Sequence, residues 1–148
     1  MGQELQKYRD HFILLVEAGF IAVNQADEDA AVKLFKASEL LDTKNLLPRI
    51  GLGYMHLCKL ELKQAGKIFE DVLAKDPNNE MARTFLGLTL SLNPAETAKG
   101  EKALEELARK AKDPEVKSLA NNALAFVEKF VKKTPTPAQV QKAAPKKK

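Results

Sequence analysis

Two histidines and one cysteine are the side chains of this sequence that most often serve as metal ligands or catalytic groups. His56 and Cys58 stand two positions apart, and His11 lies far from both along the chain. Side chains two positions apart on a helix point in different directions, so this pair can neither share a metal ion nor act as a nucleophile and its base. We therefore predict no metal site, and a single cysteine cannot form an internal disulfide.

Gly51-Leu52-Gly53 is the other short motif with possible chemistry, because closely spaced glycines can cradle a phosphate group. It lacks the preceding strand and the third glycine of a dinucleotide-binding loop. The sequence also shows no paired carboxylates or nucleophile placed beside a base, which catalysis would need. We expect no cofactor, and we predict that the protein is not an enzyme.

The composition indicates one soluble, folded domain, since 45% of the 148 residues are hydrophobic and 30% are charged. The longest apolar stretch, residues 12–23, contains Glu17 and falls short of the roughly 20 residues that cross a bilayer. The first residues have neither the basic flank nor the apolar core of a secretory signal. We therefore expect a cytoplasmic protein without membrane insertion.

The net charge of +4 comes from the C-terminal tail, residues 134–148, which contains four lysines and no acidic residue. Residues 1–133 carry the other 24 − 4 = 20 basic residues and all 20 acidic ones, so they are neutral overall. A short basic tail on a neutral body is typical of a solvated segment. We expect the tail to be disordered and predict no nucleic-acid partner.

The strongest pattern is a 34-residue repeat, marked by Gly19, Gly53 and Gly87. Ala31 and Phe35 recur 34 residues later as Ala65 and Phe69. Apolar residues spaced by three and four positions predict two helices in each unit, joined by a turn. A glycine inside a helix costs about 1 kcal/mol relative to alanine. Its repetition predicts a close approach of two helices, with Ala65 facing Gly53.

The second unit, with Leu52, Gly53, Ala65, Phe69 and Pro77, resembles the tetratricopeptide repeat. The resemblance implies an all-α fold in which three helix-turn-helix repeats, at about 12–45, 46–79 and 80–114, stack as an α-solenoid within a domain of residues 1–133.

The third unit departs from the repeat pattern. Asn93-Pro94-Ala95-Glu96 has the composition of a helix start. The second helix of this unit is predicted to be displaced by about four residues, with Ala103 and Leu107 in the alanine and phenylalanine positions. A further apolar stripe, from Val116 to Phe130, predicts a capping helix at residues 114–133.

In such a repeat the first helix of each unit also lines a concave wall. Ten of the twelve residues that we assign to this wall are apolar or aromatic, and we predict that they form a partner-binding groove. Part of this face could instead be core between units, or be covered by residues 1–10 or by a second subunit. The predicted groove residues are Ile13, Val16, Phe20, Val23, Leu47, Ile50, Tyr54, Leu57, Met81, Thr84, Leu88 and Ser91.

A small three-repeat protein with an apolar concave face and a capping helix resembles the dedicated chaperones of bacterial type III secretion systems. That resemblance implies a chaperone that holds an apolar or amphipathic segment of a secreted needle or translocator subunit. A scaffold or adaptor subunit of a stable multiprotein complex is the alternative. The sequence leaves open whether the bound segment is helical or extended, and whether the protein forms a homodimer or a heterocomplex.

Overall fold

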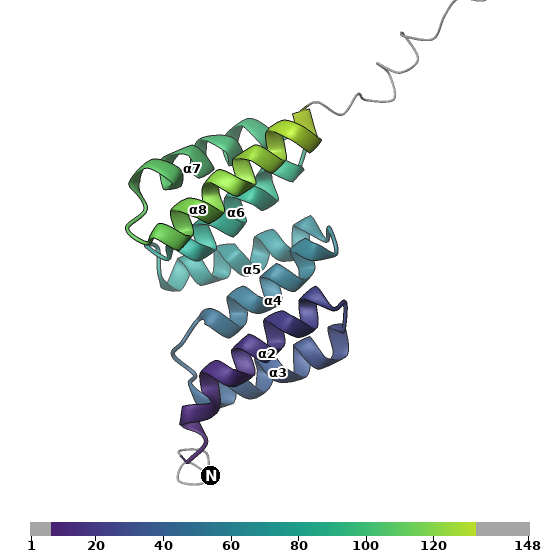
Figure 1. Cartoon of the computed structure of the whole chain (residues 1–148), viewed down its shortest axis with the longest axis vertical. Helices are drawn as coiled ribbons and strands as arrows, with labels where there is room; N and C mark the ends of the chain where they lie inside the picture. Colours follow the sequence, from purple (N-terminus) through teal and green to yellow (C-terminus); the bar gives the residue numbers. More distant parts are fainter. Residues whose placement is uncertain (1–6, 133–148) are drawn as a thin grey trace, which may run out of the picture.

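The computed structural model describes residues 7–132, and within them the chain folds into seven α-helices and no strand (Figure 1). The predicted all-α class is therefore confirmed. A 3₁₀ turn, η1 (Arg9–His11), precedes the first α-helix, and a π-helical segment, η2 (Val127–Lys132), follows the last. The seven helices are α2 (Phe12–Asn24), α3 (Glu28–Leu41), α4 (Leu47–Cys58), α5 (Leu62–Lys75), α6 (Glu80–Leu92), α7 (Thr97–Lys110) and α8 (Pro114–Phe126).

Short polar side chains begin three of these helices. Asp27 and Asn79 each accept a 3.0 Å hydrogen bond from the backbone N–H three residues later, in the first turns of α3 and α6. Asp113 accepts a 2.8 Å bond from the Glu115 N–H at the start of α8, where Pro114 takes the first position. Such caps satisfy backbone donors that have no partner within the helix. These helix starts are therefore encoded locally.

Consecutive helices pack as hairpins, α2 with α3, α4 with α5 and α6 with α7, and α8 packs against α6 and α7. Each hairpin lies within one of the three predicted repeat ranges. Contacts also join α2 to α4, α4 to α6 and α6 to α8. We call these four the inner helices, and they run in the same direction along one side of the molecule (Figure 1).

Close packing within the first two hairpins depends on a glycine under a phenylalanine ring. A Cβ atom added to Gly19 would lie 2.6 Å from Cε1 of Phe35, and one added to Gly53 would lie 2.6 Å from Cε1 of Phe69. A larger residue would therefore force the two helices apart. The predicted close approach at Gly53 is present, and the atoms nearest to the added Cβ belong to the ring of Phe69, whereas Ala65 was the predicted neighbour.

In the third hairpin the second helix is displaced by one residue, and the predicted displacement of four is wrong. Leu104 packs over Gly87, where an added Cβ would lie 3.1 Å from its Cγ. Gly100 packs directly on the backbone of α6. The positions equivalent to the alanine and phenylalanine of the first two hairpins are thus filled by Gly100 and Leu104, not by Ala103 and Leu107.

The turn between the two helices of a hairpin accounts for this displacement. Ala26 and Leu60, 34 residues apart, both adopt the left-handed backbone conformation, with φ of 59° and 58°. The equivalent position in the third hairpin is Pro94, whose ring fixes φ near about −65° and excludes that conformation. The chain makes a wider turn there, in which the Asn93 side chain accepts a 3.2 Å backbone hydrogen bond. Consequently α7 begins at Thr97 and not at the predicted proline.

The predicted capping helix, residues 114–133, corresponds to α8 and η2. The predicted stripe is only partly buried, because Phe130 is 53% exposed. The wider turn of the π-helix changes the face on which residues after Val127 lie. The predicted basic tail lies outside the described residues. The stripe residues buried against α6 and α7 are Val116, Ala120, Ala123 and Val127.

Replacing Phe69 with alanine should lower the free energy of unfolding by about 3–5 kcal/mol, because this fully buried ring fills the space above Gly53. Urea denaturation followed by circular dichroism measures the loss. The matched control is Glu70→Ala on the exposed side of the same helix, which should stay within about 0.5 kcal/mol of the parent. Equal stability of the two variants would contradict the packing.

Replacing Leu60 with glycine should instead stabilise the protein by about 0.5–1 kcal/mol. The left-handed conformation is unfavourable for leucine and freely adopted by glycine. Little burial is lost, since Leu60 is 68% exposed. Leu60→Ala removes the side chain and keeps the strain, so it is the control. A glycine variant no more stable than the alanine variant would show that the turn is not strained.

Candidate protein-binding groove

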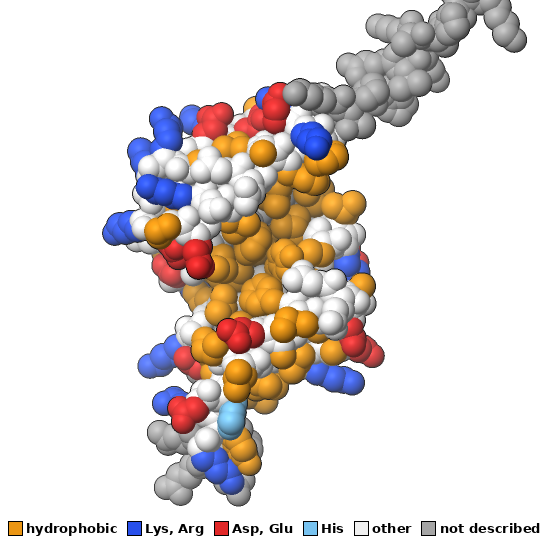
Figure 2. Space-filling model, viewed as in Figure 1, with side chains coloured by type: hydrophobic (Ala, Val, Ile, Leu, Met, Phe, Trp, Pro, Cys, Tyr) orange, Lys and Arg blue, Asp and Glu red, His pale blue; other side chains and the backbone are white. Residues whose placement is uncertain are grey.

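An apolar surface lies in a hollow on the side of the inner helices, over α4 and α6 and between α2 and α8 (Figure 2). Its side chains come from equivalent positions of consecutive inner helices, spaced 34 residues apart. All of them are exposed or half-buried. We call this surface the inner groove, and it consists of Ile13, Phe20, Leu47, Tyr54, Met81, Leu88, Leu92 and Phe126.

Six of the twelve predicted groove residues belong to this surface. They form two rows across the inner helices, and each row contains one residue from α2, α4 and α6. On a helix of 3.6 residues per turn both rows lie about 100–120° from the repeated glycine, so they avoid the contact within the hairpin. The two rows are Ile13, Leu47 and Met81, and Phe20, Tyr54 and Leu88.

The other six predicted residues lie inside the stack and not on the groove surface. Their positions are only about 40–60° from the repeated glycine, so they turn with it toward the second helix of the hairpin. Two of these six residues are polar, and their hydroxyl groups are hydrogen-bonded within α6. Thr84 donates to the carbonyl oxygen of Glu80 at 2.8 Å, and Ser91 donates to that of Gly87 at 2.7 Å. The buried residues are Val16, Val23, Ile50, Leu57, Thr84 and Ser91.

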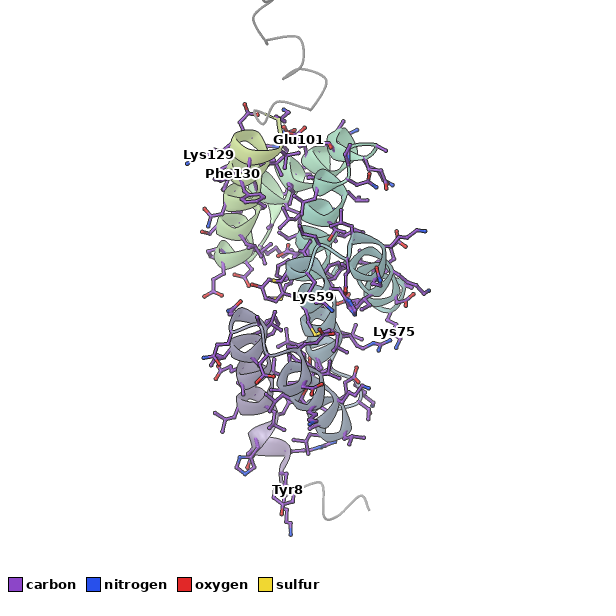
Figure 3. All side chains as sticks on the ribbon, turned by 90° about the vertical axis from the view of Figure 1, so that its right-hand side faces the viewer. Tyr8, Lys59, Lys75, Glu101, Lys129 and Phe130 are labelled. Atoms are coloured by element: carbon purple, nitrogen blue, oxygen red, sulfur yellow. The ribbon has the colours of Figure 1, made fainter. Side chains whose placement is uncertain are left out.

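Sequence reasoning missed a third row, formed by Asn24, Cys58, Leu92 and Phe126. It lies about 140° from the glycine, next to the predicted rows. The same 34-residue spacing would have found it, including the member on α8. Phe126 is 46% exposed, and its ring lies 5.0 Å from that of Phe130, centroid to centroid. Figure 3 shows Phe130 and Lys129 in η2, just beyond the end of α8 and on the side of the groove.

A continuous series of aromatic rings connects the groove to the core. Phe20 contacts the buried ring of Phe35 at a centroid distance of 5.3 Å and Tyr54 at 5.7 Å. Tyr54 contacts Phe85 at 5.4 Å, and Phe85 stacks on the buried ring of Phe69 at 5.7 Å. Such ring contacts favour defined geometries. The centre of the groove is therefore held in place by the cores of the first two hairpins.

Tyr54 also fixes the spacing between the first two inner helices. Its hydroxyl donates a 2.9 Å hydrogen bond to Oδ1 of Asn24 on α2. Burial, and after it the hydrogen bond and charge interaction with the Cys58 thiol, raise the pKa of Tyr54 to about 12. The phenol is thus neutral at physiological pH, and it presents an uncharged ring to the groove.

His56 and Cys58, which the sequence analysis considered as possible chemical groups, lie near the turn between α4 and α5. His56 contacts Glu61 through Nδ1, and Nζ of Lys59 lies 2.9 Å from carboxylate oxygens of both Glu28 and Glu61. The hydrogen bond to Glu28 and then that to Glu61 raise the pKa of Lys59. These interactions join the turns of the first two hairpins, near Lys59 in Figure 3. Cys58 is exposed in the third row.

A cleft of about 600 Å³ opens at one edge of the inner groove. It lies between the α3–α4 and α5–α6 connections, and Leu47 and Met81 belong both to its lining and to the groove. Lys44, Asn45 and Lys75 supply its polar rim. The groove is therefore apolar along its length and polar at this edge.

No protein-family model, no curated protein and no solved structure matches this chain. Between residues 7 and 132, no cluster of three or more histidine, cysteine, aspartate or glutamate side chains has the geometry to hold a metal ion. Over the same range, none of the helices combines the length and the apolar character needed to cross a membrane.

The raised pKa of Tyr54 gives a test of its surroundings. The folded state favours the neutral phenol, so this contribution to stability is complete below the unfolded pKa of about 10 and is lost as pH rises toward about 12. Thermal melts between these pH values should therefore show a steeper loss of stability in the parent than in Tyr54→Phe. Parallel pH profiles would show that Tyr54 is solvated.

Proposed function

We propose that this chain is a non-catalytic protein-binding module, a tetratricopeptide-type α-solenoid of three repeats with a capping helix. Two observations support this architecture. The inner helices recur at a 34-residue spacing, and each hairpin is closed by a glycine beneath a large apolar side chain. Stacked repeats of this kind form extended concave surfaces that bind other proteins. The module binds its partner in the inner groove.

The observation that carries the proposal is the apolar row across the centre of the groove, Phe20, Tyr54 and Leu88. These side chains are only half-buried, and Ile13 and Phe126 beside them are 52% and 46% exposed. Contiguous apolar surface of this kind on a soluble protein marks an interaction site. Removing it from water on binding is favourable by about 25 cal/mol for each Å² buried.

The groove favours a helical guest over an extended one. Its wall consists of side chains on helices whose backbone groups are already hydrogen-bonded, so it offers no strand edge to a bound peptide. An extended guest would leave its own N–H and C=O groups unpaired against an apolar surface, which costs several kcal/mol for each group. A helix satisfies these groups internally. The occupant is therefore an amphipathic helix that buries its apolar face.

A cytoplasmic chaperone of a type III secretion substrate fits this requirement. Needle and translocator subunits must be kept from associating before export, and covering an amphipathic helix of such a subunit would achieve this. The resemblance rests on the size of the chain, its repeat number and the apolar groove. The partner would then be a single small secreted protein, bound in a stoichiometric complex.

An adaptor subunit of a permanent assembly is the second candidate, favoured by apolar surface outside the groove. Leu40 is 65% exposed and lines a second cleft of about 600 Å³ with Lys36, next to the cleft at the groove edge, with which it shares Leu46 and Lys75. Figure 3 shows Lys75 on the side of the molecule opposite Phe130. An adaptor would use this outer surface as well as, or instead of, the groove.

The test is co-purification of the full chain from its native cell, with glutamate variants on each surface. Leu88→Glu and Phe126→Glu place a charge in the groove, and a bound apolar helix would have to bury it at a cost of several kcal/mol. Both should lose the partner at least about a hundredfold. Leu40→Glu is the matched control on the outer surface and should keep it.

Circular dichroism melts separate loss of binding from loss of folding. Phe126→Glu should keep the parent's melting temperature within a few degrees, since Phe126 is 46% exposed. A single secreted subunit as partner supports the chaperone, and a set of cytoplasmic proteins supports the adaptor. If both single variants, Phe126→Glu and Leu88→Glu, are folded and still bind the partner, the proposal that the groove binds it is wrong.

A further inference from the structure

The first hairpin has an apolar side that the other hairpins bury. In α4, Pro48, Leu52 and Met55 face the preceding hairpin, and Leu52 and Met55 belong to the same core cluster as Phe35. In α6, Ala82 at the equivalent position is buried against the second hairpin's core. This side of an inner helix is therefore a packing surface wherever another hairpin precedes it.

In α2 the equivalent positions are open. Leu14 is 60% exposed and Ile21 is 56% exposed, although the residues 34 positions later, Pro48 and Met55, are buried. On α3, Leu34 is equivalent to Ile68, which packs against the first hairpin's core. We call this side the first-hairpin face. Its exposed members are Leu14 and Ile21, and Ala18 and Leu34 are half-buried beside them, with Leu34 also packed on the first hairpin's core.

The other end of the stack cannot cover this face in a second copy. The terminal inner helix, α8, exposes Ser118, Asn121 and Asn122. Asn121 stands at the position of the repeated glycine, and within residues 7–132 no helix packs over it. Association of first-hairpin face to α8 would therefore bury amide groups against leucine and isoleucine, which is unfavourable. A head-to-tail chain of copies is excluded on these grounds.

The charges around the first-hairpin face are complementary to each other. Glu17 lies between Leu14 and Ile21 on α2, and Lys33 flanks Leu34 on α3, and both charged side chains are exposed. A two-fold axis that places α2 of one copy on α3 of the other brings Glu17 of each copy toward Lys33 of the other, which gives two oppositely charged pairs. An isologous contact needs this kind of self-complementary surface.

We propose that two copies of this chain associate through the first-hairpin face, with α2 of each packed on α3 of the other. Two helices of 13 and 14 residues give a footprint about 20 Å long and about 20 Å wide, or on the order of 400 Å² for each copy. The total for two copies, about 800 Å², is below the usual range for specific interfaces and fits a weak, transient contact. The dimer is therefore concentration-dependent, and both inner grooves stay open.

Sedimentation velocity of the full chain between about 1 and 100 µM measures this association. The mass should rise with concentration from the 16.4 kDa of one chain toward twice that value. Ile21→Glu should weaken the dimer at least about a hundredfold, because two unpaired charges would be buried. Phe126→Glu, in the inner groove, is the control and should dimerise as the parent does.

Charge reversal tests the arrangement of the helices. Glu17→Lys and Lys33→Glu should each weaken the dimer by about tenfold or more, and the double variant should recover it. A parent that stays monomeric over the whole range overturns the proposal, and so does an Ile21→Glu variant that dimerises normally. Failure of the double variant to recover overturns the pairing of α2 with α3. None of these outcomes depends on binding in the inner groove.

Discussion

The contact between Phe35 and two glycines is the interaction on which the rest of the structure depends. The ring lies over Gly19 of its own hairpin and over Gly51 of the next one, so a single side chain sets both the width of the first hairpin and its distance to the second. Phe69 repeats the first contact at Gly53 and replaces the second by stacking on Phe85. The rings of Phe35 and Phe69 are fully buried. The repeat therefore transmits its geometry through one large residue in each unit.

The same rings connect stability to binding. Phe20 and Tyr54 line the groove and also contact the buried rings of Phe35 and Phe85. A change in the shape of the groove would therefore disturb the core. A guest that packs on them would raise the stability of the folded state in proportion to its affinity. The surface proposed to recognise a partner is thus rigid, and little ordering of side chains would accompany binding.

The 34-residue spacing was sufficient to predict the paired helices and their order, because each unit repeats its apolar pattern. The close approach at the repeated glycine was also predicted, but not the ring that lies over it. The assignment of faces was harder to predict. Val16 and Phe20 are both apolar and lie on neighbouring parts of one helix, and hydrophobicity does not distinguish the buried residue from the open one. The start of the second helix in the third hairpin was predicted at the wrong residue because Pro94 changes the turn. The exposure of Phe130 depends on a π-helix, which the sequence pattern did not predict.

The parallel direction of α2, α4, α6 and α8 gives the groove an electrical polarity. Every peptide dipole in these four helices points the same way, so one edge of the groove gathers partial positive charge and the opposite edge partial negative charge. A helix lying in the groove antiparallel to them would place each of its own ends beside the opposite sign. Each favourable end is worth about 0.3–1 kcal/mol. The fold would therefore favour the antiparallel direction of a bound amphipathic helix over the parallel one, independently of the side chains of that helix.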